Sequence, residues 1–452
     1  MPDTMITIKD KLGYAFGDLG LSLTFSLVGP FLTMFYTDVV GLPLGQITVM
    51  MLITRLWGSF ADPLTGAFID RCKPGRTGRF RRWLIILAVP QAVFGALLFV
   101  RPGFSTASLV WVYAVNLVYV TLFSGANIPY GSLASVISPL ESDRSQLSLF
   151  RSLGAGIGSA PVAILLPMLV YSVNAAGVQS LDAAKLLRSV AALAVISLGF
   201  LAGGFAMTKE RVAPSESKPK MGKTVTALLK NRPFLVLCLA SMLNIGVVIY
   251  GQTLNSYLFK DYFLQPDLYS YYAIFTYAPM VILMFVMTPL VRRFGKKEVC
   301  AAGLVLSVAA YAAAFLLQLR NPWIYLALCF VNGLGLTCFT LQVWALVTDV
   351  LDYQAMLSGQ RDEGTAYGFY FFSRKMGHTA AGFGGAFALK LLGYVEASDG
   401  VMAAQSSQVA EGMYRAATLV PAGALLIIFL LLAFAYPLGK EKLREMREAK
   451  MA

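Results

Sequence analysis

A carboxylate and a guanidinium lie inside one strongly apolar stretch of the chain. The stretch reads RLWGSFADPLTG and places Asp62 seven residues after Arg55. On a helix this spacing puts both side chains on one face, about 10 Å apart along the axis, so a tight ion pair is not expected. Gly58 and Gly66 flank Asp62 and leave room for an ion, water or another helix. Asp62 is therefore predicted to bind a proton or a cation, and a structural pairing with Arg55 is the alternative.

Further polar side chains recur at helical spacings in the first half of the chain. Asp18 and Ser22 share a face at a spacing of four, and Ser124 and Asn127 lie about one turn apart. Arg151 lies in the glycine-lined segment LFRSLGAGIGS, where a ligand or another helix can approach closely. Because a guanidinium offers forked donors, Arg151 suits a hydroxylated or anionic ligand.

The second half of the chain carries its own polar set. Gln342 and Trp344 lie in TLQVWALVTDVLDY, where an indole beside polar groups could form a platform for a sugar ring; a tryptophan packed in a core is the alternative. Lys375 and His378 are three residues apart and share a helix face. His378 is the only histidine, so it makes no metal site, and a role in proton traffic stands beside a structural one.

Motifs of soluble enzyme chemistry are missing from the sequence. It contains no phosphate-binding glycine loop, no Gly-x-Ser-x-Gly elbow and no histidine pair at metal spacing. We therefore expect neither an enzyme nor an ATP-driven pump, and no cofactor or metal. A carrier driven by an ion gradient remains.

The composition indicates a membrane protein. Hydrophobic residues make up 57% of the 452 residues and charged residues 13%, against about 25% charged in soluble proteins. Each spanning helix needs about 20 apolar residues. Twelve such stretches are predicted, at 14–36, 46–70, 83–101, 106–130, 145–171, 188–208, 233–258, 268–291, 298–319, 323–350, 364–390 and 412–436. The expected fold class is an all-α membrane protein with twelve transmembrane helices.

The basic residues behind the net charge of +13 are concentrated in alternate loops between these helices. Alternate loops and the two ends of the chain hold 26 basic residues, whereas the opposite loops hold five. By the positive-inside rule, both termini are cytoplasmic in a multi-pass protein of the inner (plasma) membrane. No cleavable signal peptide is visible at the start. The basic excess is thus explained without a nucleic-acid partner.

Two halves are separated by a polar, proline-containing stretch. The predicted domains are an N-terminal six-helix bundle (1–208), a cytoplasmic linker (209–232) and a C-terminal six-helix bundle with a cytoplasmic tail (233–452). A basic loop follows the second span of each half, as in carriers that rock two bundles around a midplane site. The first loop matches the general loop signature of the major facilitator superfamily. Asp70, Arg71 and Arg79 in it are predicted to gate, with Asp70 as a latch between bundles or, alternatively, a solvated helix end.

Together these segments resemble the glycoside–pentoside–hexuronide:cation symporter family of the major facilitator superfamily, over essentially the whole chain. The resemblance rests on KLGYAFGDLG, FYTDVVGLPLG, RLWGSFADPLTGAFIDR, NIPYGSLASVI, DRSQLSLFR, VTDVLDY and RDEGTAYGFYFFSRKMGH. Several of these look closer to the β-glucuronide permease branch than to the melibiose permease. The resemblance implies two six-helix bundles that carry a sugar together with Na⁺, Li⁺ or H⁺.

The resemblance also implies roles for individual residues. Asp62 falls at the principal cation carboxylate, with Gly58 and Ser124 at other cation-site positions. Asn127 falls at a position that serves both sugar and cation, and Ser22 at a sugar-binding aspartate. Arg151 matches the sugar-site arginine, and Lys375 the lysine that bridges the two sites. The substrate-binding set is completed by Asp18, Gln342 and Trp344.

Three carboxylates of the melibiose permease pattern are replaced here by Ser22, Gly58 and Asn127. Because a Na⁺ site prefers several oxygen ligands with compensating charge, whereas one carboxylate can still carry a proton, H⁺ coupling is favoured over Na⁺ coupling and over uncoupled facilitation. The retained Arg151 and Lys375 admit an anionic sugar such as a glucuronide. The expected function is import of a glycoside by cation symport, by a protein that acts as a monomer in the lipid bilayer. The alternatives are a carrier of an amphiphile such as a lysolipid, and a receptor that has lost transport.

Overall fold

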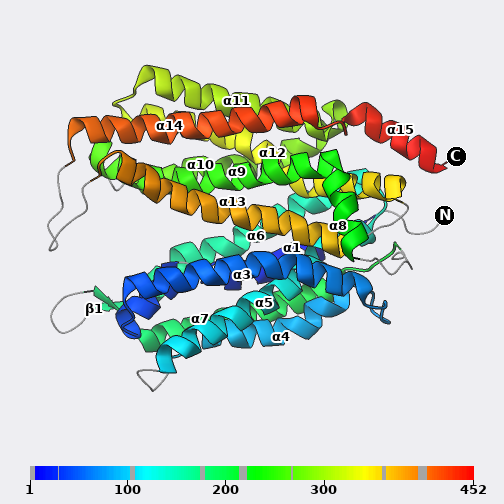
Figure 1. Cartoon of the computed structure of the whole chain (residues 1–452), viewed down its shortest axis with the longest axis horizontal. Helices are drawn as coiled ribbons and strands as arrows, with labels where there is room; N and C mark the ends of the chain where they lie inside the picture. Colours follow the sequence, from blue (N-terminus) through cyan, green and yellow to red (C-terminus); the bar gives the residue numbers. More distant parts are fainter. Residues whose placement is uncertain are drawn as a thin grey trace. The chain divides into compact units, whose positions relative to one another are not determined.

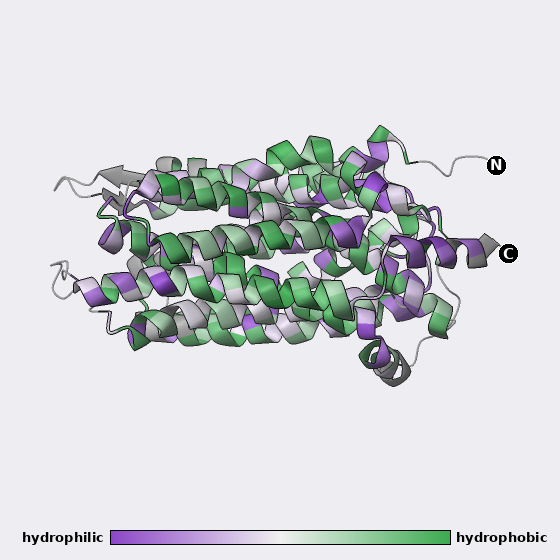
Figure 2. Ribbon diagram, turned by 90° about the horizontal axis from the view of Figure 1, so that it is seen from above, coloured by the Kyte–Doolittle hydropathy of each residue, from purple (hydrophilic) through white to green (hydrophobic). Residues whose placement is uncertain are grey.

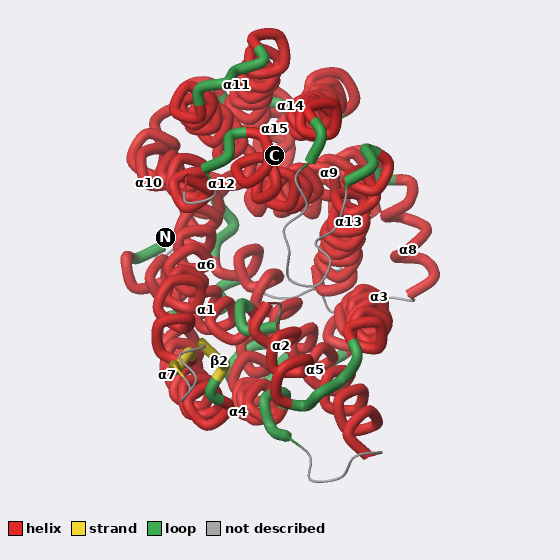
Figure 3. The backbone as a smooth tube through the Cα atoms, turned by 90° about the vertical axis from the view of Figure 1, so that its left-hand side faces the viewer, coloured by secondary structure: helices red, strands yellow, loops and turns green. Residues whose placement is uncertain are grey.

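The computed structural model describes residues 6–28, 30–101, 107–173, 179–212, 221–265, 268–358, 363–394 and 405–451. Nearly all of these residues are helical, and loops join the helices at their ends (Figure 3). The chain folds into two compact units. The first comprises Met1–Thr226 and Gln354–Phe372, and the second comprises Ala227–Tyr353 and Ser373–Ala452.

The first unit is built mainly from long helices of the N-terminal half. Its elements are α1 (Ile8–Phe25), α2 (Pro30–Met34), η1 (Phe35–Val39), α3 (Leu44–Arg71), α4 (Arg81–Leu97), α5 (Ala107–Ile137), α6 (Glu141–Val170), β1 (Tyr171–Val173), β2 (Gln179–Leu181) and α7 (Ala183–Met207). Helix α1 packs against α6 and α7, while α5 packs against α3 and α4. In Figure 1, α3, α4, α5 and α7 run along one common direction.

Close packing of α1 depends on glycines in its neighbours. A Cβ atom at Gly154 of α6 would overlap the carbonyl oxygen of Ala15, and one at Gly204 of α7 would lie 2.9 Å from the carbonyl oxygen of Gly13. The backbones of α6 and α7 therefore approach α1 without intervening side chains, as is common between membrane helices. This packing fixes the position of the polar side chains on α1.

The second unit contains the remaining long helices. Its elements are α9 (Arg232–Tyr257), η2 (Leu258–Tyr262), α10 (Tyr269–Phe294), α11 (Lys296–Leu317), α12 (Pro322–Ser358), α13 (Glu363–Leu391), α14 (Ser407–Leu430), η4 (Leu431–Ala435) and α15 (Lys440–Met451). Helix α14 packs against α9 and α11. The C-terminal end of α12 and the N-terminal part of α13 belong to the first unit. Along the sequence, the division between the units falls within α8 (Met221–Lys230).

Within the described residues, seven helices are long and apolar enough to cross a membrane: α5, α7, α9 with η2, α10, α11, α12 and α14 with η4. Five further long helices, α1, α3, α4, α6 and α13, are shorter or more polar, and four of them carry candidate site residues. Apolar residues dominate the middle of the helices in Figure 2, and large side chains such as Phe285 and Phe434 are exposed. Lipid would cover such side chains, because water-soluble monomers rarely expose large apolar patches.

The first predicted span differs from the structure in one respect. A single stretch was expected over 14–36, but α1 ends at Phe25 and α2 begins at Pro30. Proline fits the first position of a helix because it needs no backbone donor there, whereas it would break a continuous one. The predicted domain limits 1–208, 209–232 and 233–452 stay a prediction, since the compact units follow spatial packing.

Candidate functional site

Arg151 of α6 is the centre of a buried polar cluster in the first unit. Its side chain is 2% exposed, and its Nε atom lies 3.5 Å from Oδ1 of Asp18 on α1. Nη1 of Arg151 donates to the Tyr14 hydroxyl at 3.4 Å. Two residues predicted separately as substrate-binding, Asp18 and Arg151, are thus brought together by the packing of α1 against α6.

Aromatic rings enclose this guanidinium. Its central carbon lies 4.7 Å from the ring centroid of Tyr130 on α5 and 5.6 Å from that of Phe371 on α13. Tyr14 and Tyr130 stack with their centroids 4.8 Å apart, and the Tyr130 hydroxyl donates to the Tyr14 carbonyl at 2.6 Å. Cation–π contacts and these hydrogen bonds hold Arg151 in one orientation.

The aromatic members of the cluster were not singled out from the sequence. Tyr14 precedes Asp18 by four residues, so the helix face that they share could have identified Tyr14 as a neighbour of Asp18. Tyr130 follows Pro129 within NIPYGSL, but no spacing connects it to Arg151. Phe371 comes from the far end of the chain, and only the fold brings it here.

The other candidates of the first unit lie on the same helices. Ser22 on α1 is half-buried next to Gly158 of α6, where an added Cβ would be 3.1 Å from that of Ser22. On α5, Ser124 is fully buried and Asn127 is 9% exposed. Their assignments to sugar or cation stay predictions.

Asp62 is buried within α3, with 1% of its surface exposed, and Gly58 is buried as well. The neighbouring small residues receive another helix. A Cβ at Gly66 would overlap the backbone of Gly364 on α13, and one at Gly368 would lie 2.5 Å from the Asp62 carbonyl oxygen. An ion, water or another helix was expected beside the small residues around Asp62, and another helix, α13, lies beside part of this face.

Arg55 and Asp62 differ in environment. Arg55 is exposed, whereas Asp62 is buried, although both belong to α3. Because burying a carboxylate is costly, the position of Asp62 has to be explained by its surroundings within the first unit.

Asp70 at the end of α3 binds the beginning of α13. Its Oδ1 accepts from the backbone N–H of Gly364 at 3.0 Å, and its Oδ2 accepts from the backbone N–H and the hydroxyl of Thr365 at 2.7 and 2.8 Å. A carboxylate at this position satisfies donors that an α-helix leaves free at its N-terminus. The predicted latch residue therefore joins segments that are 294 residues apart.

The loop after α3 is organised by Glu210, a residue that the sequence did not single out. Its carboxylate accepts from the backbone N–H groups of Arg79, Phe80 and Arg81, each at 2.8 Å. Gly78 has a φ of +107°, and a Cβ there would overlap the Glu210 carboxylate. Of the predicted gating residues, Arg79 is buried and held by this contact, while the side chain of Arg71 is exposed.

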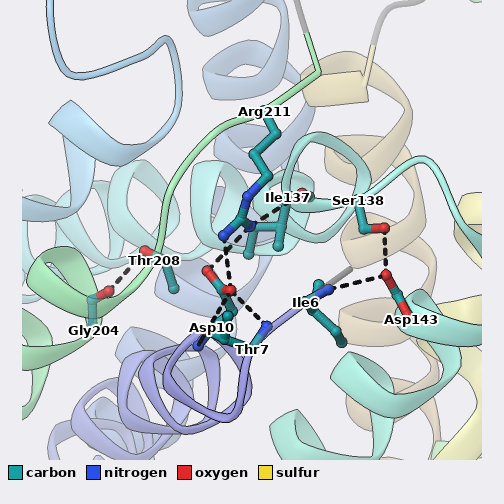
Figure 4. Close-up of polar contacts among 9 residues, drawn as sticks. All are labelled: Ile6, Thr7, Asp10, Ile137, Ser138, Asp143, Gly204, Thr208 and Arg211. Carbon is teal, nitrogen blue, oxygen red and sulfur yellow. Dashed lines mark hydrogen bonds and ion pairs between the residues drawn. The ribbon is translucent and has the colours of Figure 1, made fainter. Parts of the chain in front are cut away.

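The next residue, Arg211, is bound just as firmly (Figure 4). Its Nη1 and Nη2 atoms lie 3.1 and 2.9 Å from the two carboxylate oxygens of Asp10. Thr7 caps α1 by accepting from the Asp10 backbone N–H, and its own backbone N–H donates to the same carboxylate at 2.9 Å. Burial raises the pKa of Asp10, but the hydrogen bonds from Arg211 and Thr7 outweigh it and leave the pKa below its ordinary value. The segment after α7 is therefore attached to the first unit.

In the second unit, the side chain of Arg374 lies over the indole ring of Trp344 on α12. The guanidinium carbon of Arg374 lies 5.1 Å from the centroid of the Trp344 ring. Gln342 is 1% exposed, and Lys375 on α13 is half-buried. A ligand that stacks on this ring face would have to displace Arg374 or use the other face.

Asp349, which the sequence places beside these residues, has a different partner. Lys296 at the start of α11 lies 2.7 and 2.9 Å from its two carboxylate oxygens, and both side chains are at most 3% exposed. Lys296 was counted with a basic cytoplasmic loop, but it is buried. Pairing explains how both charges are accommodated. Among the described residues, no group of three or more His, Cys, Asp or Glu side chains could hold a metal ion.

Comparison with known proteins agrees with this architecture. A family model described as MFS/sugar transport protein matches residues 13–440. An uncharacterized symporter of Bacillus subtilis is 30% identical, covering 97% of this chain and 94% of its own. A glucuronide carrier protein homolog of Escherichia coli is 28% identical, covering 96% of this chain and 93% of its own.

The fold also matches a solved structure. The crystal structure of FucP, a major facilitator superfamily transporter in the outward conformation, aligns with a TM-score of 0.65 at 16% identity, covering 96% of this chain and 99% of the other. At this identity the similarity shows the fold alone: an all-α membrane protein of the major facilitator superfamily fold, as predicted. With a family model that spans nearly the whole chain, the protein belongs to the MFS/sugar transport protein family.

Proposed function

We propose that the chain imports a glycoside across the plasma membrane in symport with a cation, through alternating access of two six-helix bundles. The observation that carries this proposal is the buried Arg151, which lies against Asp18 and between the rings of Tyr130 and Phe371. Sugar recognition needs forked donors, acceptors and ring faces in one place, and this cluster offers all three.

The proposed substrate is a glycoside with an anionic sugar, such as a glucuronide. A guanidinium binds a carboxylate through two parallel hydrogen bonds, which a neutral hydroxyl cannot match. The name of the glucuronide carrier protein homolog supports this class. Ser22, Asn127, Gln342, Trp344 and Lys375 complete the proposed substrate-binding set.

The proposed coupling ion is a proton carried by Asp62. Its burial supports this assignment, because desolvation favours the neutral form of a carboxylate. Gly58, Ser124 and Asn127 accompany it at the proposed cation site, and Lys375 is proposed to compete with the ion for the carboxylate. With few acids retained, Na⁺ is the second choice.

Asp70, Arg71 and Arg79 are proposed to gate the cytoplasmic side. The hydrogen bonds from Asp70 to Gly364 and Thr365 would hold that side closed and would have to break for it to open. We also propose that both chain termini are cytoplasmic and that the carrier acts as a monomer.

Transport by purified protein in vesicles tests this function. A pH-sensitive dye inside the vesicles should report proton entry only when an accepted glycoside is added outside, from a panel of glucuronides, glucosides, galactosides and xylosides. Sugar uptake without proton flux or a Na⁺ requirement would indicate an uncoupled facilitator. Uptake of a lysolipid and of no glycoside would replace the sugar with an amphiphile.

A further inference from the structure

The second unit contains a pocket that none of the predicted site residues lines. It lies among α9, α10, α11 and α12 and leaves about 420 Å³ of empty space, counted with its open mouth. Ala273 and Tyr277 are exposed at the mouth, whereas Tyr272, Tyr311 and Asn332 are at most 6% exposed at the floor. Because this space includes the open mouth, the enclosed part is smaller and would receive one end of a ligand.

Tyrosine rings form walls with fixed positions. Tyr269 and Tyr272 stack at a centroid distance of 5.7 Å and an interplanar angle of 16°. The Tyr269 hydroxyl donates to the backbone carbonyl of Gln252 at 3.2 Å, and Nε2 of Gln252 donates to the Tyr277 hydroxyl at 2.7 Å. The rings on α10 are therefore tied to α9 before any ligand arrives.

Two polar groups of the pocket lack a partner among the described residues. They are Oγ1 of Thr276 and Oδ1 of Asn332, a buried side chain whose amide group also donates to the Tyr311 hydroxyl. A buried acceptor without a hydrogen bond costs about 1–3 kcal/mol, so such a group is expected to bind water or a ligand. Both groups line the same pocket.

The backbone of α12 at Asn332 is held by its neighbours. The Ser307 hydroxyl donates to its backbone carbonyl at 2.8 Å. The next residue, Gly333, brings α12 against α10, since a Cβ there would lie 2.7 Å from the Thr276 carbonyl oxygen. The helix is thus held where Asn332 lines the pocket beside Tyr311.

We propose that this pocket binds the uncharged, hydroxyl-bearing aglycone end of a glycoside. Among the described residues, no Asp, Glu, Lys or Arg lines it, so it offers no charged side chain to pair with an anion or a cation. The tyrosine rings suit an apolar or aromatic body, and Asn332 Oδ1 with Thr276 Oγ1 suits a hydroxyl donor. The inference rests on the proposed glycoside transport and adds to it a second determinant of specificity.

Paired ligands test this pocket. Binding of phenyl and para-hydroxyphenyl glycosides of the same sugar is measured by calorimetry on the full chain in lipid nanodiscs, for glucuronides, glucosides, galactosides and xylosides. The wild type should bind the hydroxyphenyl member about tenfold more tightly, as expected for a hydrogen bond to a buried acceptor. Thr276→Val and Asn332→Leu, which keep the branching of the side chain and remove its polar atoms, should reduce or abolish this preference. Thr348→Val is the control, because that hydroxyl donates to the Ala345 carbonyl within α12.

The outcomes separate the two proposals. Equal binding of both members by the wild type, or a preference that survives in both variants, would overturn the pocket while glycoside transport stands. If the wild type binds no glycoside of the panel, the proposed function fails and the pocket proposal fails with it. Melting temperatures without ligand supply an independent readout: removing an unpaired polar atom should leave them unchanged or higher. If Asn332→Leu does not fold, Thr276→Val near the pocket mouth decides.

Discussion

Nε of Arg151 and Oδ1 of Asp18 lie 3.5 Å apart in the first unit, and their side chains are 2% and 13% exposed. A guanidinium paired in this way is stable while the carrier is empty. In the proposed function, an anionic sugar would share or replace Asp18 as the partner of Arg151, which would connect substrate binding to the charge of the cavity.

Replacing Arg151 should weaken substrate binding directly. Arg151→Ala removes forked donors that water in a closed cavity cannot imitate, at a cost of about 1.5–3 kcal/mol in binding free energy. Arg151→Lys keeps the charge without the fork and should fall in between. Equilibrium binding of the accepted glycosides measures both. Unchanged affinity in Arg151→Ala would exclude this residue from the site.

Replacing Lys375 should affect coupling more than abundance. If Lys375 competes with the transported ion for Asp62, as proposed, Lys375→Gln removes this competition, and the ratio of ions to sugar moved should fall while sugar exchange persists. Ion and sugar fluxes recorded in the same vesicles give this ratio. A variant that fails to reach the membrane would show that the lysine is structural.

Replacing one partner of the Lys296–Asp349 pair should destabilise the protein, whereas replacing both partners together should be tolerated. Lys296→Met leaves an uncompensated buried carboxylate and should destabilise the second unit by about 3–5 kcal/mol. The double variant Lys296→Met with Asp349→Leu should recover most of this loss. Thermal unfolding of the purified variants measures the difference. A double variant no more stable than the single one would mean that the charges serve another role.

The ion pair of Asp10 should make the stability of the fold sensitive to acid. Its pKa is lowered in the folded state, so its contribution to stability is complete above the ordinary value of 3.8 and is lost as the pH falls through the lower folded value. The difference in melting temperature between wild type and Asp10→Asn should therefore shrink below about pH 4. Glu445→Gln is the control, because the Glu445 carboxylate is exposed. A difference that stays constant with pH would contradict the ion pair with Arg211.

The sequence was sufficient for the fold class because apolar length and loop charge depend on local composition. The contiguous loop signature also singled out Asp70, whose role as a latch between bundles stays a prediction because its partners Gly364 and Thr365 belong to the same unit. Partners could not be predicted where they come from distant segments: Thr365 for Asp70, Lys296 for Asp349 and Phe371 for Arg151. No spacing rule connects such pairs.

Burial was the other unpredictable property. Arg55 and Asp62 fall on nearly the same face of an ideal helix, yet one is exposed and the other buried, because α13 packs along only part of α3. Likewise, Glu210 looked like an ordinary linker charge, although its carboxylate caps the start of α4. Such roles depend on which helix end lies nearby.

The central claim is that Asp62 changes its charge during the transport cycle. Asp62→Asn resembles the protonated form permanently, so the loaded and empty carrier should both reorient without stripping water from a charge. The decisive measurement compares uphill accumulation with downhill counterflow of an accepted glycoside in vesicles that carry a proton gradient. Accumulation should be abolished in Asp62→Asn while counterflow and binding remain measurable. Accumulation against the gradient in this variant would contradict the coupling role and leave Asp62 a structural residue.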